Sequence, residues 1–143
     1  MSPSTTADIR PADQADREAV ERLWESAGLT RAAPDEWAAL ISGETSAVLI
    51  ALDGQQVVGS AIASFDGWRA YIYHVAVDPS HREHGLGHEL MAAAEQYLLS
   101  AGARWVHVMV NEENTGGLAL AGEMGYLPEG DVVLAKRLAT RVA

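Results

Sequence analysis

Two Asp-Gly pairs, at residues 53–54 and 66–67, divide the middle of the chain and leave little choice of fold there. Asp-Gly between hydrophobic runs is the strongest short-range signal for a β-hairpin, because the tight turn needs positive φ angles that glycine adopts readily. The runs that these pairs separate are residues 47–52, 57–65 and 70–77. The sequence therefore predicts three antiparallel strands, joined as a meander, at the centre of the fold.

Apolar residues recur at helical spacing before the meander. Val20, Leu23 and Trp24 follow the i, i+3, i+4 pattern that places side chains on one face of a helix. We expect this helix to open at Pro11 and to end at Gly28, since proline suits a helix start and glycine a left-handed cap.

The same reasoning extends along the chain. Residues 85–100 predict a helix that Gly102 stops. The other expected elements are a strand at 7–10, a helix after Pro34 that stops at Gly43, a strand at 105–110, a short helix at 118–124 and a strand at 131–138.

The resulting order is β-α-α-β-β-β-α-β-α-β. A meander followed by a β-α-β crossover predicts an α+β layered fold with a mixed sheet, and no repeat or linker divides the chain. We therefore expect one domain over residues 1–143.

Composition limits the classes of function. The chain has 143 residues, of which 48% are hydrophobic and none is cysteine, so a disulfide scaffold, a thiolate metal site and a cysteine nucleophile are excluded. The formal net charge of −10 disfavours nucleic acid as a partner and suits cationic substrates such as amines, although solubility alone would also explain it. We find no secretory signal and no apolar run long enough for a membrane span, so we expect a soluble cytoplasmic protein without a metal cofactor.

The segment between the third meander strand and the long helix carries the chemistry. Arg82, Gly85 and Gly87 form an R-x-x-G-x-G pattern at the start of that helix. Uncapped backbone N–H groups and the helix dipole favour a phosphate there, and glycine lets the phosphate approach the backbone. Three histidines crowd the same stretch and could add positive charge when protonated, at positions 81, 84 and 88.

Two other glycine-containing motifs fit this segment less well. The pattern lacks the G-K-[S/T] ending of a Walker motif, and it follows a meander rather than the first strand of a dinucleotide-binding unit. A nucleotide-binding module unrelated to coenzyme A is therefore disfavoured. A strand–helix connection that merely tolerates glycine remains the simple alternative.

Two segments resemble the GNAT superfamily of acetyl-CoA-dependent N-acetyltransferases. Residues 75–90, V-A-V-D-P-S-H-R-E-H-G-L-G-H-E-L, are similar to the family's signature segment. Residues 114–126 resemble its second conserved segment, in which an asparagine precedes a short helix and a Gly-Tyr pair. The resemblance covers nearly the whole chain and is strongest to small bacterial YpeA-like acetyltransferases. It implies a mostly antiparallel sheet of six to seven strands flanked by about four helices.

The resemblance also implies cofactor-binding residues. The strand end at Val75, Ala76 and Val77 would pair with the pantetheine arm of acetyl-CoA, with the Val75 N–H as donor to the thioester oxygen. The pyrophosphate would lie against Arg82, Glu83, His84, Gly85, Leu86, Gly87 and His88. Asn114 would bind the arm from the other side, where the two central strands part.

The implied reaction is direct attack of an amine on the thioester, with both substrates bound. Amines are protonated near neutral pH, so a base is needed. At one place where relatives carry a glutamate base this chain has Tyr71, and at another it has Met109. Tyr71, which we expect to share the strand face of Val75, and the strand histidines His74 and His107 are the alternative candidates.

A second departure concerns the general acid. Many relatives carry a tyrosine seven residues after the asparagine, whereas this chain has Ala121. A catalytically weak acyl-CoA-binding sensor of the same fold is therefore the second hypothesis.

Three tryptophans have an expected place. Trp24 and Trp37 are expected in the core or beside the acceptor groove, and Trp68 in an acceptor wall or a dimer contact. Many relatives are homodimers, and the acceptor amine is left open.

Overall fold

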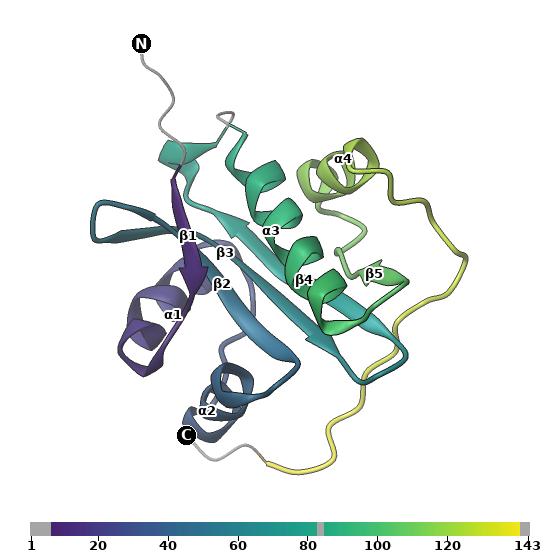
Figure 1. The fold of residues 1–143 in the computed structure, drawn as a ribbon, viewed down its shortest axis with the longest axis horizontal. Coiled ribbons are helices and arrows are strands. Elements are labelled where there is room, and N and C mark those ends of the chain that lie inside the picture. Colours follow the sequence, from purple (N-terminus) through teal and green to yellow (C-terminus); the bar gives the residue numbers. More distant parts are fainter. Residues whose placement is uncertain (1–6, 83–84, 141–143) are drawn as a thin grey trace.

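A computed structural model describes residues 7–82 and 85–140 as a five-stranded sheet with helices on both faces (Figure 1). The elements in chain order are β1 (Asp8–Pro11), a 3-10 turn (Gln14–Asp16), α1 (Arg17–Ser26), α2 (Pro34–Ser42), β2 (Ser46–Asp53), β3 (Gln56–Phe65), β4 (Ala70–Val77), a 3-10 turn (Pro79–His81), α3 (Leu86–Ala101), β5 (Val106–Val108) and α4 (Thr115–Glu123).

The strand order is β1-β2-β3-β4-β5. The first four strands are antiparallel neighbours, and β5 runs parallel to β4. The meander predicted from the Asp-Gly pairs is confirmed, since Gly54 and Gly67 both adopt positive φ in the two connecting turns. The crossover from β4 through α3 to β5 supplies the mixed part of the sheet.

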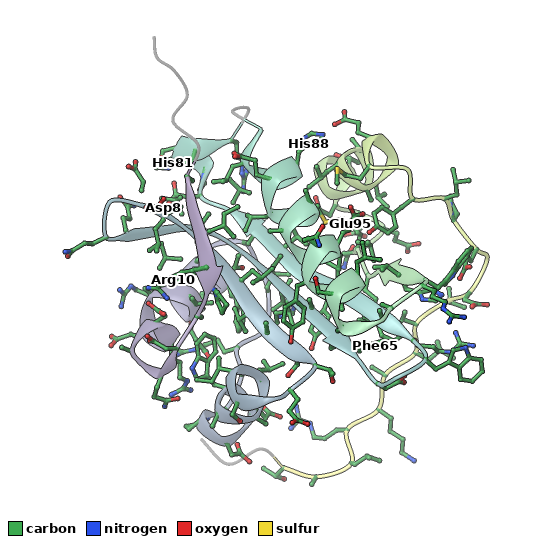
Figure 2. All side chains as sticks on the ribbon, viewed as in Figure 1. Asp8, Arg10, Phe65, His81, His88 and Glu95 are labelled. Atoms are coloured by element: carbon green, nitrogen blue, oxygen red, sulfur yellow. The ribbon has the colours of Figure 1, made fainter. Side chains whose placement is uncertain are left out.

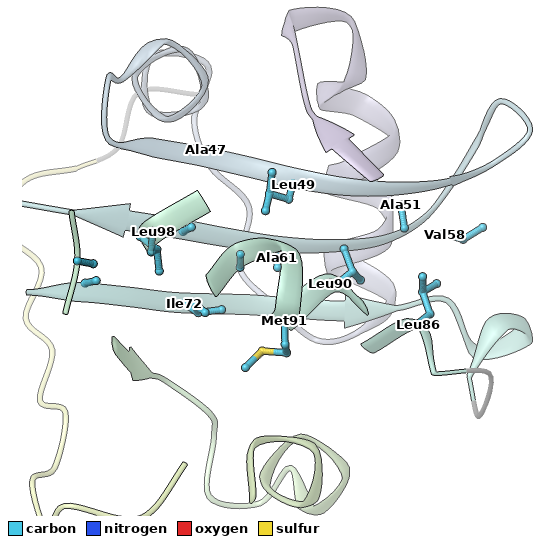
Figure 3. Packing of buried hydrophobic residues seen from close by; sticks show 14 residues of the cluster. Ala47, Leu49, Ala51, Val58, Ala61, Ile72, Leu86, Leu90, Met91 and Leu98 are labelled. Carbon is cyan, nitrogen blue, oxygen red and sulfur yellow. The ribbon is translucent and has the colours of Figure 1, made fainter. Parts of the chain in front are cut away.

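Each face of the sheet has its own apolar core. On one face α3 packs Leu90, Met91 and Leu98 against β2, β3 and β4 (Figure 3). On the other face α1 and α2 bury Trp24 and Trp37, whose rings meet edge to face at 6.0 Å. The interpretation of these two tryptophans as core residues is therefore correct. Among the described residues no helix is long and apolar enough to span a bilayer.

The first helix begins later than the sequence predicts. Pro11 is the last residue of β1, opposite Leu49, on an edge strand where a missing N–H is tolerated. The chain then turns, and the Asp13 side chain caps the 3-10 turn by accepting from Ala15 N at 2.9 Å. The capping signal at Asp13 therefore outweighs the proline signal.

The last predicted strand is wrong for this chain. Residues 131–138 form neither helix nor strand, and every residue from 127 to 140 is exposed. The sheet of the described chain therefore has five strands rather than six to seven. A strand needs an edge to pair with, and in this structure the segment reaches none. Figure 1 shows it in yellow, leaving α4 and passing outside the other elements.

Candidate functional site

An opening between β4 and β5 is the central feature of the site. β5 pairs with β4 only along residues 70–72, and one further bond joins Met109 N to Ile72 O at 3.0 Å. Beyond that point no strand of the described chain pairs with the β5 side of β4. The backbone of residues 73–77 therefore offers the kind of strand edge to which an extended ligand with amide groups can add.

A β-bulge lies where this opening begins. Ile62 pairs with Tyr73 and Ser60 with Ala76, so β4 has two residues opposite the single Ala61. His74 takes up the extra length with φ 50°, a left-handed conformation that is uncommon outside glycine.

The bulge changes which face each side chain of β4 occupies. Ile72 and Val75 both pack in the core under α3, although alternation along a regular strand would place them on opposite faces. Tyr73 packs on the other face, with α1 and α2. The expectation that Tyr71 and Val75 share a face is therefore wrong, because the extra residue at His74 reverses the alternation.

A buried hydrogen-bond chain holds the bulge. The Trp24 indole donates from Nε1 to Ser60 Oγ at 2.9 Å, and the Ser60 hydroxyl donates to the His74 carbonyl at 3.1 Å. Trp24 and Ser60 are fully or almost fully buried. Buried hydrogen bonds of this kind are costly to leave unmade, so the chain fixes the course of β4 at the bulge.

The His74 ring is also fixed. Its Nε2 lies 3.0 Å from the Thr30 carbonyl oxygen, which can only accept, so Nε2 carries the hydrogen. The ring meets Trp24 edge to face at 4.9 Å. Burial lowers the pKa of His74, while the bond to Thr30 opposes this shift. A neutral imidazole with hydrogen on Nε2 leaves Nδ1 as a proton acceptor.

The loop that carries Thr30 is tied to α1 by a buried carboxylate. Glu21, which is 1% exposed, lies 2.8 Å from Arg31 Nε and 3.4 Å from Arg17 Nε. It also accepts from Ala32 N at 3.3 Å. This cluster holds the connection between α1 and α2 against β4.

The N-terminus of α3 has the features of an anion site. Gly85 is its N-cap with φ +78°, no side chain caps the helix from that position, and a Cβ on Gly85 would meet nothing within 4 Å. The Arg82 Nε donates to the Val77 carbonyl at 3.2 Å, which ties the loop to the end of β4. Glu83 and His84 lie outside the described residues. The fit of an anionic pyrophosphate here is supported by the open Gly85 cap at the end of a long helix.

Gly87 differs from Gly85 in its surroundings. A Cβ there would lie 3.0 Å from Leu120 Cδ2, so the glycine lets α4 pack closely on α3. His88 Nε2 lies 2.8 Å from a Glu123 carboxylate oxygen of α4, whereas His81 Nε2 lies 2.9 Å from an Asp53 carboxylate oxygen in the β2–β3 turn. Figure 2 shows both histidines at the same end of the molecule. The expected histidine cluster is therefore divided between two separate partners.

The second conserved segment forms α4. Asn114 is its N-cap and accepts from Gly117 N at 2.9 Å, and a Cβ on Gly117 would lie 2.6 Å from the Asn114 amide nitrogen. Ala121 is buried in the helix. The Tyr126 hydroxyl donates to Glu95 of α3 at 2.6 Å, and burial, followed by this carboxylate, raises the pKa of Tyr126 strongly. Tyr126 therefore anchors α4 and is a poor proton donor.

The remaining base candidates lie where β4 and β5 still pair. The rings of Tyr71 and His107 are 5.4 Å apart, and His107 Nε2 lies 2.9 Å from Glu129. An open hollow of about 440 Å³ adjoins them and is lined by Trp68, Arg69, Trp105, His107, Glu129 and Asp131. Trp68 is 77% exposed, as expected from its turn.

The structure brings four of the residues that the sequence singled out to one end of β4. Val75, Ala76 and Val77 lie on the bulged half of that strand, and Arg82, on the loop that leads to α3, donates to the Val77 carbonyl. Sequence reasoning missed Ser60 and Thr30. The sequence does contain a signal for Ser60, because a hydroxyl between apolar residues in the middle of β3 needs a buried hydrogen-bond partner.

Fold and site together define a class of protein: an α+β domain with parted central strands, a bulged β4 and a helix that opens on glycine. A family model described as "Acetyltransferase (GNAT) family" matches residues 12–126. An acetyltransferase of Pectobacterium atrosepticum is 30% identical over 134 residues, which cover 92% of this chain and 95% of that protein. The chain therefore belongs to the GNAT acetyltransferase family.

Solved structures of low identity show the same fold. An aminoglycoside acetyltransferase from an uncultured soil metagenomic sample, in complex with sisomicin, is 21% identical with a TM-score of 0.76 and covers 93% of this chain and 96% of its own. AAC(6')-Iy in complex with a CoA-containing bisubstrate analogue is 20% identical with a TM-score of 0.77, covering 94% of this chain and 100% of its own. A transcriptional regulator from Bacillus halodurans is 15% identical with a TM-score of 0.78, covering 92% of this chain and 100% of its own.

Proposed function

We propose that this protein transfers an acetyl group from acetyl-CoA to a primary amine by direct attack in a ternary complex. The observation that carries the proposal is the opening beside the bulged half of β4, which continues through the Arg82 loop to the open N-cap of α3. An extended amide-bearing arm suits the strand edge, and a pyrophosphate suits the helix terminus.

Acetyl-CoA supplies an activated thioester, and this chain's residues position and deprotonate the reactants. The amine nitrogen attacks the carbonyl carbon, the C–S bond breaks, and the amine loses a proton to a base. We assign to the Val75 backbone N–H the stabilisation of the negative charge that develops on the thioester oxygen. His74 is our candidate base, since its lowered pKa keeps the imidazole neutral near pH 7.

The acceptor is proposed to be a cationic amine. The net charge of −10 attracts such molecules, and the aminoglycoside acetyltransferases among the structural neighbours bind ligands of this kind. Tyr71 and Tyr73, on the face opposite the α3 core, would line the acceptor side, and the Thr30 loop would border it.

A second candidate function is supported by α4. Ala121 offers no hydroxyl, and the Tyr126 hydroxyl is held by Glu95. The leaving thiolate would then depart without a tyrosine as proton donor, which favours a weakly catalytic acyl-CoA-binding protein as the alternative.

One experiment separates the two candidates. CoA-thiol release from acetyl-CoA is measured over a panel of polyamines, aminoglycosides, amino acids and lysine peptides, with wild type beside Ala121→Tyr. Turnover by wild type with one amine class supports the acetyltransferase. No turnover by wild type, together with tight acetyl-CoA binding, supports the weakly catalytic acyl-CoA-binding protein.

Cofactor binding is tested with two glycine variants. Gly85→Asp should weaken acetyl-CoA affinity by about tenfold or more, because a carboxylate would occupy the proposed phosphate position. Gly28→Asp is the matched control, since Gly28 has φ +76° and open space at its Cβ but lies at the end of α1. Its affinity should stay within about twofold of wild type. Undiminished affinity in Gly85→Asp would contradict the assignment of the loop.

A further inference from the structure

Glu21 is a charged residue on the buried face of α1. Its neighbours on that face are Val20, Leu23 and Trp24, and Glu21 itself is 1% exposed. A buried carboxylate is costly unless it is paired and hydrogen-bonded, and even a well-paired one often adds less to stability than an apolar side chain of similar size. Stability of the core is therefore a poor explanation for a carboxylate at this position.

The two carboxylate oxygens of Glu21 bind the connection between α1 and α2, residues 27–33. Oε1 accepts from Arg31 Nε at 2.8 Å, and Oε2 accepts from the backbone N–H of Ala32 at 3.3 Å. Arg17, one helical turn before Glu21, lies 3.4 Å from Oε2 and donates from Nη2 to the Ala32 carbonyl at 3.0 Å. Both backbone groups of Ala32 are therefore held from α1.

These bonds fix the connection on one side of Thr30, and a backbone bond fixes it on the other. Leu29, just before Thr30, donates from its backbone N–H to the Trp24 carbonyl at 2.8 Å. Thr30 itself faces β4, where its carbonyl oxygen lies 3.0 Å and its hydroxyl 3.4 Å from His74 Nε2. The position of the Thr30 carbonyl is thus set by its neighbours in the chain, and two of them are held by Glu21.

The state of the His74 ring depends on that carbonyl. Among the described residues Thr30 is the only hydrogen-bond partner of the ring, whose other contacts are edge to face with Trp24 at 4.9 Å and with Tyr73 at 5.6 Å. Ring contacts of this kind do not determine which nitrogen carries the hydrogen. A carbonyl oxygen, which can only accept, does determine it.

We propose that Glu21 is a positioning residue for His74: it holds the α1–α2 connection so that the Thr30 carbonyl keeps the hydrogen on Nε2 and leaves Nδ1 to accept the proton of the amine. The inference rests on the proposed function, in which His74 is the base. Glu21 acts through Arg31 and Ala32 rather than by contact with the ring.

The NMR signal of the His74 ring N–H tests the inference without any acetyl transfer. A hydrogen bond to a carbonyl slows the exchange of this hydrogen with water, so we expect a ¹H–¹⁵N signal from Nε2 in wild type. The chain has five histidines, and loss of the signal in His74→Asn assigns it. Glu21→Gln should lose the signal as well, because a neutral amide binds the Arg31 guanidinium more weakly and the connection loosens.

Glu25→Gln is the matched control. Glu25 lies on the same helix and is also a partner of Arg31, at 3.3 Å, but its side chain is 52% exposed. The same change of charge there should keep the His74 signal, because Ala32 stays bound to Glu21. A merely structural ion pair at Glu21 predicts lower stability of Glu21→Gln in urea with an unchanged His74 signal.

Arg31→Gln removes the same contact from a side chain that is 53% exposed, so it provides the test if Glu21→Gln does not fold. It should also lose the His74 signal. A signal that persists in every folded variant of Glu21 and Arg31, or a wild type without the signal, would overturn the inference.

Kinetics separate this inference from the proposed function. With an amine that wild type acetylates, kcat of Glu21→Gln should fall by about tenfold or more at pH 7, while KM for acetyl-CoA stays within about twofold of wild type. Glu25→Gln should match wild type in both. A lost His74 signal with unchanged kcat would contradict His74 as the base and would leave the link from Glu21 to the ring supported.

Discussion

The two sides of β4 are built differently. Toward β3, β4 pairs along its length, interrupted only by the bulge, over cores that bury Trp24, Trp37 and Leu90 completely or nearly so. Toward β5, pairing stops after Ile72, and β5 itself is half-buried. The comparison teaches that the β1–β4 side carries most of the packing of this domain, while the β5 side leaves part of β4 as an unpaired strand edge, where the proposed cofactor would bind.

The largest expected effect separates the two sides directly. Ile72→Ala should lower the free energy of unfolding by about 2–5 kcal/mol, because Ile72 is completely buried and its loss leaves a cavity. Val108→Ala on β5 should lower the free energy of unfolding by about 1 kcal/mol or less, because that side chain is only partly buried. Urea unfolding followed by circular dichroism measures both. Equal losses at the two positions would break the comparison.

A smaller effect is expected where the two sides meet, at the bulge. Trp24→Phe removes the donor to Ser60, whereas Trp37→Phe removes an indole N–H that has no partner among the described residues. Both changes remove similar ring area from the same core. We therefore expect Trp24→Phe to be the more destabilising by about 1 kcal/mol, and to lower thiol release as well. If urea unfolding shows that Trp37→Phe lowers the free energy of unfolding as much as Trp24→Phe does, the hydrogen-bond chain does not hold the bulge.

The smallest expected effect depends on pH. Burial lowers the pKa of His74 below its ordinary value of 6.5, so the unfolded chain binds the proton more readily than the folded one. Stability from this group is present above pH 6.5 and falls as the pH drops through 6.5 toward the lowered folded pKa. His74→Asn tolerates the left-handed backbone but does not titrate.

The measurement is the difference in unfolding midpoint between wild type and His74→Asn from about pH 7.5 to about pH 5, since other titrations cancel between the two proteins. Wild type should lose more stability than the variant as the pH falls. Parallel curves would show that His74 titrates alike in the folded and unfolded chains.

Much of the β1–β4 side was predictable from local signals. The Asp-Gly turns define the meander, and the bounds of β4 agree with the predicted 70–77. The long helix was predicted to within one residue, because apolar spacing and glycine at each end both act locally. The position of Arg82 and Gly85 between β4 and α3 was also predicted from the sequence, while their role in cofactor binding stays a prediction.

The features that the sequence did not predict have a different cause, because each depends on contacts between residues that are distant in the sequence. No residue near His74 predicts a bulge, because the hydrogen bonds that hold it come from Trp24 and Ser60, which lie on other elements. In the sequence Gly87 resembles Gly85, and only the structure shows that Leu120 of α4 packs against Gly87. The pattern at 131–138 is that of a strand, yet a pattern cannot supply the edge on which a strand forms.

The bulge at His74 has a consequence for how this enzyme family member could diversify. Ile72 before the bulge and Val75 after it both pack on the α3 face, whereas Tyr73 packs on the face of α1 and α2. Under the proposed function, the side chains of Tyr71 and Tyr73 adjoin the amine, and the backbone at Val75 adjoins the thioester. Substitution of Tyr71 or Tyr73 would then change the choice of acceptor amine without disturbing acetyl-CoA. Selection could therefore alter acceptor specificity and cofactor binding one at a time on the same strand.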